Sequence, residues 1–180
     1  MIKFTPVKKI TVAVLILLLP VFLITFQGCR KKRSEVANLL FKKTHNKVFQ
    51  EYTPEGFSKV FKKVLNRERS NLKHADFIID HYTKNHYKPE LLIDHLFNND
   101  MYTMTDYYLK ANEHGLDASM FDADGLRTLI YKFNDKTHSR TIDEAYNDIA
   151  ELELTAANSL INYSNALQYG IINPKIIYQR

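Results

Sequence analysis

The stretch that decides the fold runs from Ser139 to Pro174, SRTIDEAYNDIAELELTAANSLINYSNALQYGIINP, and carries the longest uninterrupted helical pattern in the chain. Thr141 and Glu144 form a capping box at its start. Gly170, followed by Ile171, is a stop signal in which we expect glycine in the left-handed conformation. Because Pro174 prevents a restart, the pattern predicts a helix of roughly 28 residues and about 42 Å.

One face of this helix carries apolar side chains at every third or fourth position, and such a face needs partners. Its members are Ile142, Tyr146, Ile149, Leu152, Ala156, Leu160, Tyr163 and Leu167. No segment alternates polar and apolar residues over the length of a strand, and five glycines leave little for hairpins. The sequence therefore predicts an all-α fold, a small multi-helix domain packed around the long C-terminal helix and preceded by a signal or anchor segment.

The N-terminus has the pattern of an export signal. Lys3, Lys8 and Lys9 precede an apolar run over residues 10–26, which ends in Gln27-Gly28-Cys29. A small residue before cysteine indicates lipoprotein processing with lipid attached to Cys29, the only cysteine in the chain. An uncleaved membrane anchor and plain cleavage are the alternatives. We expect residues 1–28 as signal or anchor, 29–52 as a basic tether with a weak helix, and 53–180 as a helical scaffold-like domain.

Charge divides the remaining chain into two parts. Residues 29–75 hold 13 Lys and Arg against 4 acids, and residues 76–180 hold 9 against 16. Arg30, Lys31, Lys32 and Arg33 would lie beside a membrane and bind anionic head groups, or they are solvated residues of a tether. Nucleic acid is not an expected partner, because the aromatic residues lie on apolar helix faces and do not alternate with the charges.

Five further helices are expected between the tether and the long helix. The first begins at Thr53-Pro54, with Lys59, Lys62 and Lys63 opposite its apolar face, and either docks on the domain or seeks a membrane surface. The others are expected over residues 71–85, 89–97, 103–114 and 122–134, with Thr103 and Asp106 as a capping box.

No active site emerges from the residues alone. The seven histidines lack metal-ligand spacing, the serines lack a nucleophile motif, and Glu151 and Glu153 point to different helix faces. Tyr102, Tyr107 and Tyr108 form either a sugar-stacking surface or core. We therefore expect no catalytic residue, no metal and no cofactor in this chain.

Three short segments, in this order, carry a family resemblance. Residues 77–89 are FIIDHYTKNHYKP, residues 108–121 are YLKANEHGLDASMF, and residues 152–174 are LELTAANSLINYSNALQYGIINP. This succession resembles the helical scaffold domain of the large bacterial L,D-transpeptidases, envelope enzymes that cross-link peptidoglycan. We call the matching positions the signature residues, and the resemblance implies a structural role for them: Tyr82, Pro89, Gly115, Leu116, Thr155, Tyr163, Gly170 and Pro174.

The chain departs from that family in two respects. The tryptophan that usually follows the proline is missing, and Leu91 and Leu92 stand there. The family's histidine and Ser-x-Gly-Cys-x-Arg nucleophile loop have no counterpart, so no catalytic residue is carried over. The chain is expected to be either a truncated form of a longer enzyme or a stand-alone scaffold relative.

The resemblance implies a non-catalytic scaffold module that serves peptidoglycan cross-linking and cell wall organisation. We expect it in the bacterial cell envelope, anchored to a membrane and facing the periplasm, with peptidoglycan or a catalytic L,D-transpeptidase domain as partner. Two alternatives differ in class. One is an envelope lipoprotein that binds a peptide, glycan or protein, and the other is an anchor whose basic helices regulate an envelope partner.

Overall fold

The structure is a computed structural model that describes residues 33–95, 97–135 and 140–171. The chain divides into two units, Met1–Lys32 and Arg33–Arg180, and all described residues belong to the second. The predicted signal or anchor, Cys29, the basic residues 30–32 and Pro174 lie outside the described residues. Within the described ranges, no helix has the length and hydropathy needed to cross a membrane.

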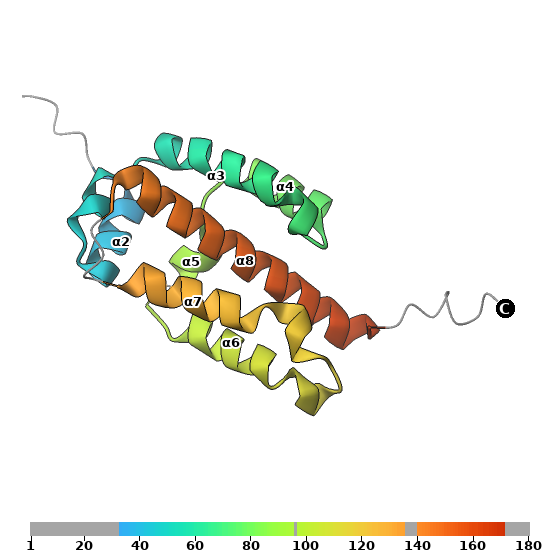
Figure 1. Cartoon of the computed structure of the whole chain (residues 1–180). Helices are drawn as coiled ribbons and strands as arrows, with labels where there is room; N and C mark the ends of the chain where they lie inside the picture. The colour runs from blue at the N-terminus through green and yellow to red at the C-terminus, as the bar shows by residue number, and fades with distance from the viewer. Residues whose placement is uncertain (1–32, 96, 136–139, 172–180) are drawn as a thin grey trace, which may run out of the picture. The chain divides into compact units, whose positions relative to one another are not determined.

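The described residues are helical and contain no strand, which confirms the predicted all-α fold (Figure 1). The α-helices are α2 (Glu35–Thr44), α3 (Pro54–Glu68), α4 (Ala75–Lys84), α5 (Glu90–Asp94), α6 (Asp100–Leu109), α7 (Ala123–Asn134) and α8 (Ile142–Tyr169). Short 3-10 helices lie between them: η1 (Lys47–Glu51), η2 (Arg69–Asn71), η3 (Ala111–His114) and η4 (Ala118–Phe121).

Helix α8 begins and ends where its sequence signals predict. The Glu144 N–H donates to Thr141 Oγ1 over 3.3 Å, and the Thr141 N–H donates to the Glu144 carboxylate over 2.7 Å, which completes the capping box. At the other end Gly170 has φ 76° and ψ 174°. The positive φ requires glycine, but this ψ lies outside the left-handed helical region that we expected.

Helix α8 lies at the centre of the domain, between α3 on one side and α7 on the other (Figure 1). Because helices surround its first half, burial there extends well beyond the predicted face. Ala145, Ala150 and Ala156 are fully buried, and their small side chains allow neighbouring helices to approach closely. The predicted face is wrong at two positions in the second half, where Leu160 is 36% and Leu167 52% exposed.

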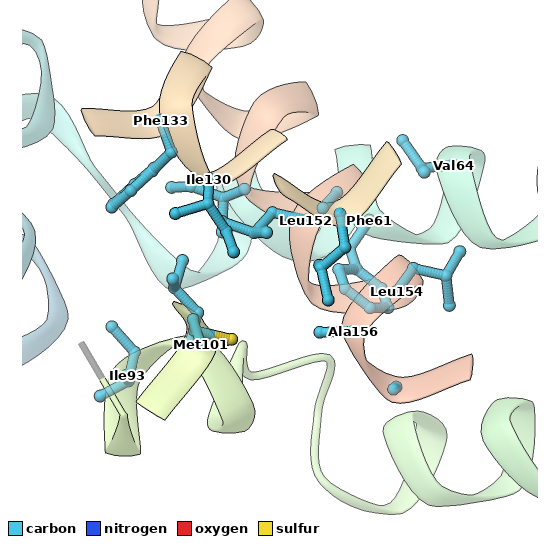
Figure 2. Packing of buried hydrophobic residues seen from close by; sticks show 14 of the residues in the cluster. Phe61, Val64, Ile93, Met101, Ile130, Phe133, Leu152, Leu154 and Ala156 are labelled. Carbon is cyan, nitrogen blue, oxygen red and sulfur yellow. The ribbon is translucent and has the colours of Figure 1, made fainter. Parts of the chain in front are cut away.

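Helix α3 docks against α8 through its apolar face. Phe57, Phe61, Val64 and Leu65 are buried, and Figure 2 shows Phe61 and Val64 beside Leu154 of α8. This confirms the docked alternative for α3, since the side chains that would enter a membrane surface are already covered. Lys59, Lys62 and Lys63 remain exposed on the opposite side.

The residues before α3 contribute to the same core as the helices after it. Leu40 of α2 and Phe49 of η1 are fully buried. The ring of Phe49 lies 5.9 Å from that of Phe133 in α7 and also faces the Arg140 guanidinium. Residues 33–52, expected as a tether and a weak helix, thus pack on the domain.

Four expected helix boundaries are wrong, and one of them is the end of α6, which lies at Leu109 and not at residue 114. Helix α4 begins at Ala75 and not at residue 71, because residues 72–74 leave the helical path and the Lys73 N–H donates to Asn158 of α8 over 3.2 Å. Helix α6 begins at Asp100, so Thr103 lies inside the helix and does not cap it. The Thr103 N–H donates to the Asn99 carbonyl. Helix α5 already ends at Asp94.

Candidate functional site

A buried carboxylate joins three elements at the middle of α8. Glu153 is fully buried, and its Oε1 accepts a hydrogen bond of 2.8 Å from the hydroxyl of Tyr82 in α4. The backbone N–H groups of Leu91 and Leu92 donate to the same carboxylate over 2.9 and 2.7 Å. These are donors at the N-terminus of α5, where the helix dipole favours negative charge. Glu153 therefore caps α5 and fixes α4 beside it.

Burial governs the protonation of this carboxyl. Removal from water raises the pKa of Glu153 to about 7, although the hydrogen bonds from Leu92, Tyr82 and Leu91 act in the opposite direction. Burial, and next the negative charge of Glu153, also raise the pKa of Tyr82 above its ordinary value. With three donors satisfied and no exposed surface, Glu153 is a structural junction and not a general base.

The signature residues lie at three different places in the fold. Tyr82 donates to Glu153, and buried Pro89 is the N-cap residue of α5. Gly115, with φ 72°, ends η3 and lets the N–H of buried Leu116 donate to the Ala111 carbonyl over 3.0 Å. Gly170 ends α8. Thr155 and Tyr163 line surface hollows described below.

An aromatic cluster occupies the second half of α8. The Tyr163 ring lies 5.1 Å from the rings of both Tyr108 and Phe121, and 6.5 Å from the ring of His114. Among the described residues, the buried hydroxyl groups of Tyr108 and Tyr163 have no hydrogen-bond partner. Of the three tyrosines that the sequence grouped as a sugar-stacking surface or core, Tyr108 is core, and Tyr107 is 57% exposed.

Two adjacent hollows form what we call the apolar groove, which crosses the second half of α8. The larger hollow, of about 360 Å³, lies between α5, α6 and α8 and is lined mainly by Leu91, Met104, Tyr107, Leu160 and Tyr163. The smaller, of about 200 Å³, lies between α4, α5 and α8 and includes Phe77 and Ala157. Leu91 and Leu160 line both hollows, so they form the ridge between them.

A third hollow, the polar cleft, lies between α3, η2, α7 and α8. Its volume is about 340 Å³, and its walls include Glu68, Asn71, Glu151, Thr155 and Asn158. Arg67 stands beside this cleft and donates to Glu68 over 2.7 Å and to Glu151 over 2.9 Å. The cleft thus offers carboxylate, amide and hydroxyl groups, which suit hydrogen-bonding ligands.

Three histidines of the described residues contact polar side chains. His74 contacts Asn165 at 3.0 Å, His81 lies 3.3 Å from Glu90, and His95 Nδ1 lies 2.7 Å from Asp100. The His95 hydrogen bond, together with one from Asn98, lowers the pKa of the Asp100 carboxyl below its ordinary value. Within residues 33–171, apart from the gaps named above, no group of three metal-ligating side chains gathers.

The sequence did not single out the features that dominate the site. Glu153 was considered only as a neighbour of Glu151, and the structure confirms that the two point to different faces, since Glu151 is part exposed. A carboxylate inside the apolar run LELTAA was the available signal. Of the membrane-proximal basic residues, only Arg33 is described, and it is exposed.

Comparison with known proteins gives one match. A family model with the description "Scaffold domain" matches residues 76–180, more than half of the chain. These residues include α4 to α8, and so the Glu153 junction and the apolar groove. No curated protein and no solved structure matches the chain significantly.

Proposed function

Because the chain belongs to the scaffold domain family, we propose that it is the non-catalytic scaffold module of an L,D-transpeptidase-like protein of the bacterial cell envelope, serving peptidoglycan cross-linking. The observation that carries this proposal is the position of the signature residues. Tyr82 donates to Glu153, Pro89 is the N-cap residue of α5, and Gly115 and Gly170 make turns with positive φ. Positions that the L,D-transpeptidase resemblance selects thus hold the helices together.

The module's contribution to the reaction is placement. In the enzymes that it resembles, an acyl group passes from a stem tetrapeptide through a cysteine thioester to an amine on a neighbouring stem. The sequence contains no counterpart of the Ser-x-Gly-Cys-x-Arg loop that carries the nucleophile in those enzymes. A rigid body built around the 28 residues of α8 would hold a catalytic domain at a fixed distance from the membrane.

The anchoring in this proposal rests on the N-terminal sequence. Export through the segment 1–28, lipid on Cys29 and attraction of residues 30–33 to anionic head groups would place the domain at a membrane facing the periplasm. Radiolabelled palmitate incorporated into the wild type and lost in Cys29→Ala would support lipidation, and equal labelling of both would contradict it.

The test of the scaffold role is the composition of peptidoglycan in cells with and without this chain. We expect the fraction of L,D-cross-linked stems to fall when the chain is deleted and to recover when the wild type is restored. The purified chain alone should release no transpeptidation product. Unchanged cross-linking after deletion, or turnover by the chain alone, would contradict the proposal.

A second candidate function is a binding module without enzymatic kinship, and the polar cleft favours it. Carboxylate, amide and hydroxyl groups around about 340 Å³ suit a glycan or peptide. This alternative predicts that the chain co-sediments with purified peptidoglycan at low salt and that Asn158→Leu releases it. Absence of the wild type from the pellet would rule the alternative out.

A further inference from the structure

The apolar groove brings large, partly exposed apolar side chains from several helices together around two adjoining hollows. Phe77 of α4 is 64% exposed, Tyr107 of α6 is 57% exposed, and Leu160 between them is 36% exposed. They come from three helices and line two adjoining hollows. Contiguous apolar surface of this kind marks a place where another molecule binds.

The spacing of the two hollows indicates the shape of that molecule. Along α8, the smaller hollow is lined by Ala157, Leu160 and Ile161, and the larger by Leu160 and Tyr163. The two hollows adjoin at the ridge of Leu91 and Leu160, the smaller on the α4 side and the larger on the α6 side. Side chains three or four positions apart on a helix lie on one face, about 5 to 6 Å from each other. A helix lying across α8 could place one such side chain on each side of the ridge.

The charge of the surrounding chain indicates the polar character of the partner. From residue 76 to residue 171 there are 16 Asp and Glu against 7 Lys and Arg. Asp94 and Glu113, which flank α5 and α6, are exposed. A partner with cationic residues beside its apolar side chains would be attracted to this region, and an anionic one would be repelled.

The larger hollow also selects the chemistry of the side chain that enters it. Tyr108 and Tyr163 line it, both are more than nine-tenths buried, and neither hydroxyl has a partner among the described residues. The two hydroxyl oxygens expose almost no surface, so an entering side chain would contact the rings. A tyrosine ring suits aromatic walls, because aromatic rings pack favourably in offset or edge-to-face arrangements.

We propose that the apolar groove binds an amphipathic, cationic helix of a partner protein, with a tyrosine in the larger hollow and an aliphatic side chain in the smaller. This inference rests on the proposed function, since a scaffold module acts by holding partners. It names the chemistry by which one partner is held, and it assigns that role to the second half of α8.

The experiment uses the full-length chain in phosphatidylcholine nanodiscs, with empty nanodiscs as background. The probe is a fluorescein-labelled, alanine-based helical peptide of about 16 residues, with Tyr and Leu four positions apart and lysines on its remaining faces. Fluorescence anisotropy should show saturable binding that weakens at higher salt. Replacing the probe's lysines with glutamate, or its tyrosine with alanine, should weaken binding at least tenfold. Absence of saturable binding would overturn the proposal.

Matched variants locate the binding site. Leu160→Lys on the ridge, or the more exposed Phe77→Lys, should weaken binding at least tenfold and leave the circular dichroism spectrum unchanged. Leu167→Lys is the control, because Leu167 is an exposed leucine of α8 that lines neither hollow. Equal affinity of wild type and Leu160→Lys would overturn the proposal, and so would an equal loss in Leu167→Lys.

Other occupants of the groove give different results. If a chain ending at Ile171 binds the probe at least tenfold tighter, residues 172–180 compete for the groove and the partner helix is excluded. If sedimentation shows a dimer that Leu160→Lys dissociates, a second copy is the occupant. Failure of the peptide to bind, with L,D-cross-linking still dependent on the chain, would reject this inference and leave the proposed function standing.

Discussion

The two halves of α8 share one apolar stripe but have opposite surroundings. From Ala145 to Ala157, most side chains are buried among α3, α5, α7 and η1. From Leu160 to Tyr169, large apolar side chains emerge at the surface, with Leu167 52% and Tyr169 69% exposed. The two halves of one helix can therefore have different structural roles. Its first half holds the domain together, and its second half leaves apolar surface exposed.

Polar groups follow the same division. In the first half, buried Asp148 accepts from Arg140 over 2.7 Å, and buried Glu153 accepts from three donors. In the second half, the Tyr163 hydroxyl and Asn162 Oδ1 are buried without a partner among the described residues. Burying an unpaired polar group costs stability. The buried polar groups named in the first half of α8 have hydrogen-bond partners, whereas those named in the second half do not.

The largest effect should come from Glu153→Ala. This change leaves the Tyr82 hydroxyl and the N–H groups of Leu91 and Leu92 without their acceptor, and it opens a cavity beside them. We expect a loss of about 3 to 5 kcal/mol in the free energy of unfolding, measured by urea denaturation. Glu151→Ala, two positions away and part exposed, should cost less than about 1 kcal/mol. Similar losses of unfolding free energy in Glu153→Ala and Glu151→Ala would contradict the contrast between the buried and the part-exposed carboxylate.

The next effect compares two leucines of α8 on either side of the division. Leu152 is 1% exposed and Leu160 is 36% exposed. Leu152→Ala should lower the free energy of unfolding by about 2 to 4 kcal/mol, because it leaves a cavity in the core. Leu160→Ala should cost less than about 1 kcal/mol. Thermal and chemical unfolding of both variants measure this contrast, and equal costs would contradict it.

The third effect is a pH dependence that originates in the first half. The pKa of Glu153 is about 7 in the folded state, above its ordinary 4.5. Between these pH values the folded state binds more protons than the unfolded state, so stability falls as pH rises from about 4.5 to 7.

From pH 5 to pH 8, this term should lower the free energy of unfolding by about 2 kcal/mol. Glu153→Gln keeps the volume but cannot ionise, so its stability should change less over the same range. Parallel curves for wild type and Glu153→Gln, measured by urea denaturation at each pH, would show that Glu153 does not supply the dependence.

The smallest effect concerns the start of the well-packed half. Thr141→Ala removes the hydroxyl that accepts from the Glu144 N–H, and it should cost about 1 kcal/mol. Thr141→Ser keeps the hydroxyl acceptor and should cost no more than about 0.3 kcal/mol of unfolding free energy. Hydrogen exchange of the first amides of α8 would sharpen the result, because fraying should stop before the buried alanines.

The sequence predicted the elements with strong local signals. Thr141 with Glu144 marked the start of α8 and Gly170 its end, and Thr53-Pro54 marked the start of α3. These signals rest on contacts within a few residues. Where a boundary depended on distant groups, as with Lys73 bonded to Asn158, the prediction was wrong.

Most of the candidate site was beyond prediction from the sequence. Leu160 and Leu167 occupy the same helical stripe as Leu152, so periodicity assigned all three to the core. Only the positions of α4, α5 and α6 leave Leu160 on an open ridge and Leu167 in solvent. Periodicity identifies a face, but it carries no information on how far the neighbouring helices extend along it.

The sequence by itself determined that this chain is all-α, that a helix of 28 residues organises it, and where that helix begins and ends. Local backbone preferences, capping hydrogen bonds and apolar periodicity suffice for these. Only the tertiary structure decided that Glu153 is a junction of three elements and that Leu91 and Leu160 separate two hollows. Burial and contact between residues 60 to 90 positions apart depend on how helices pack, which no local pattern specifies.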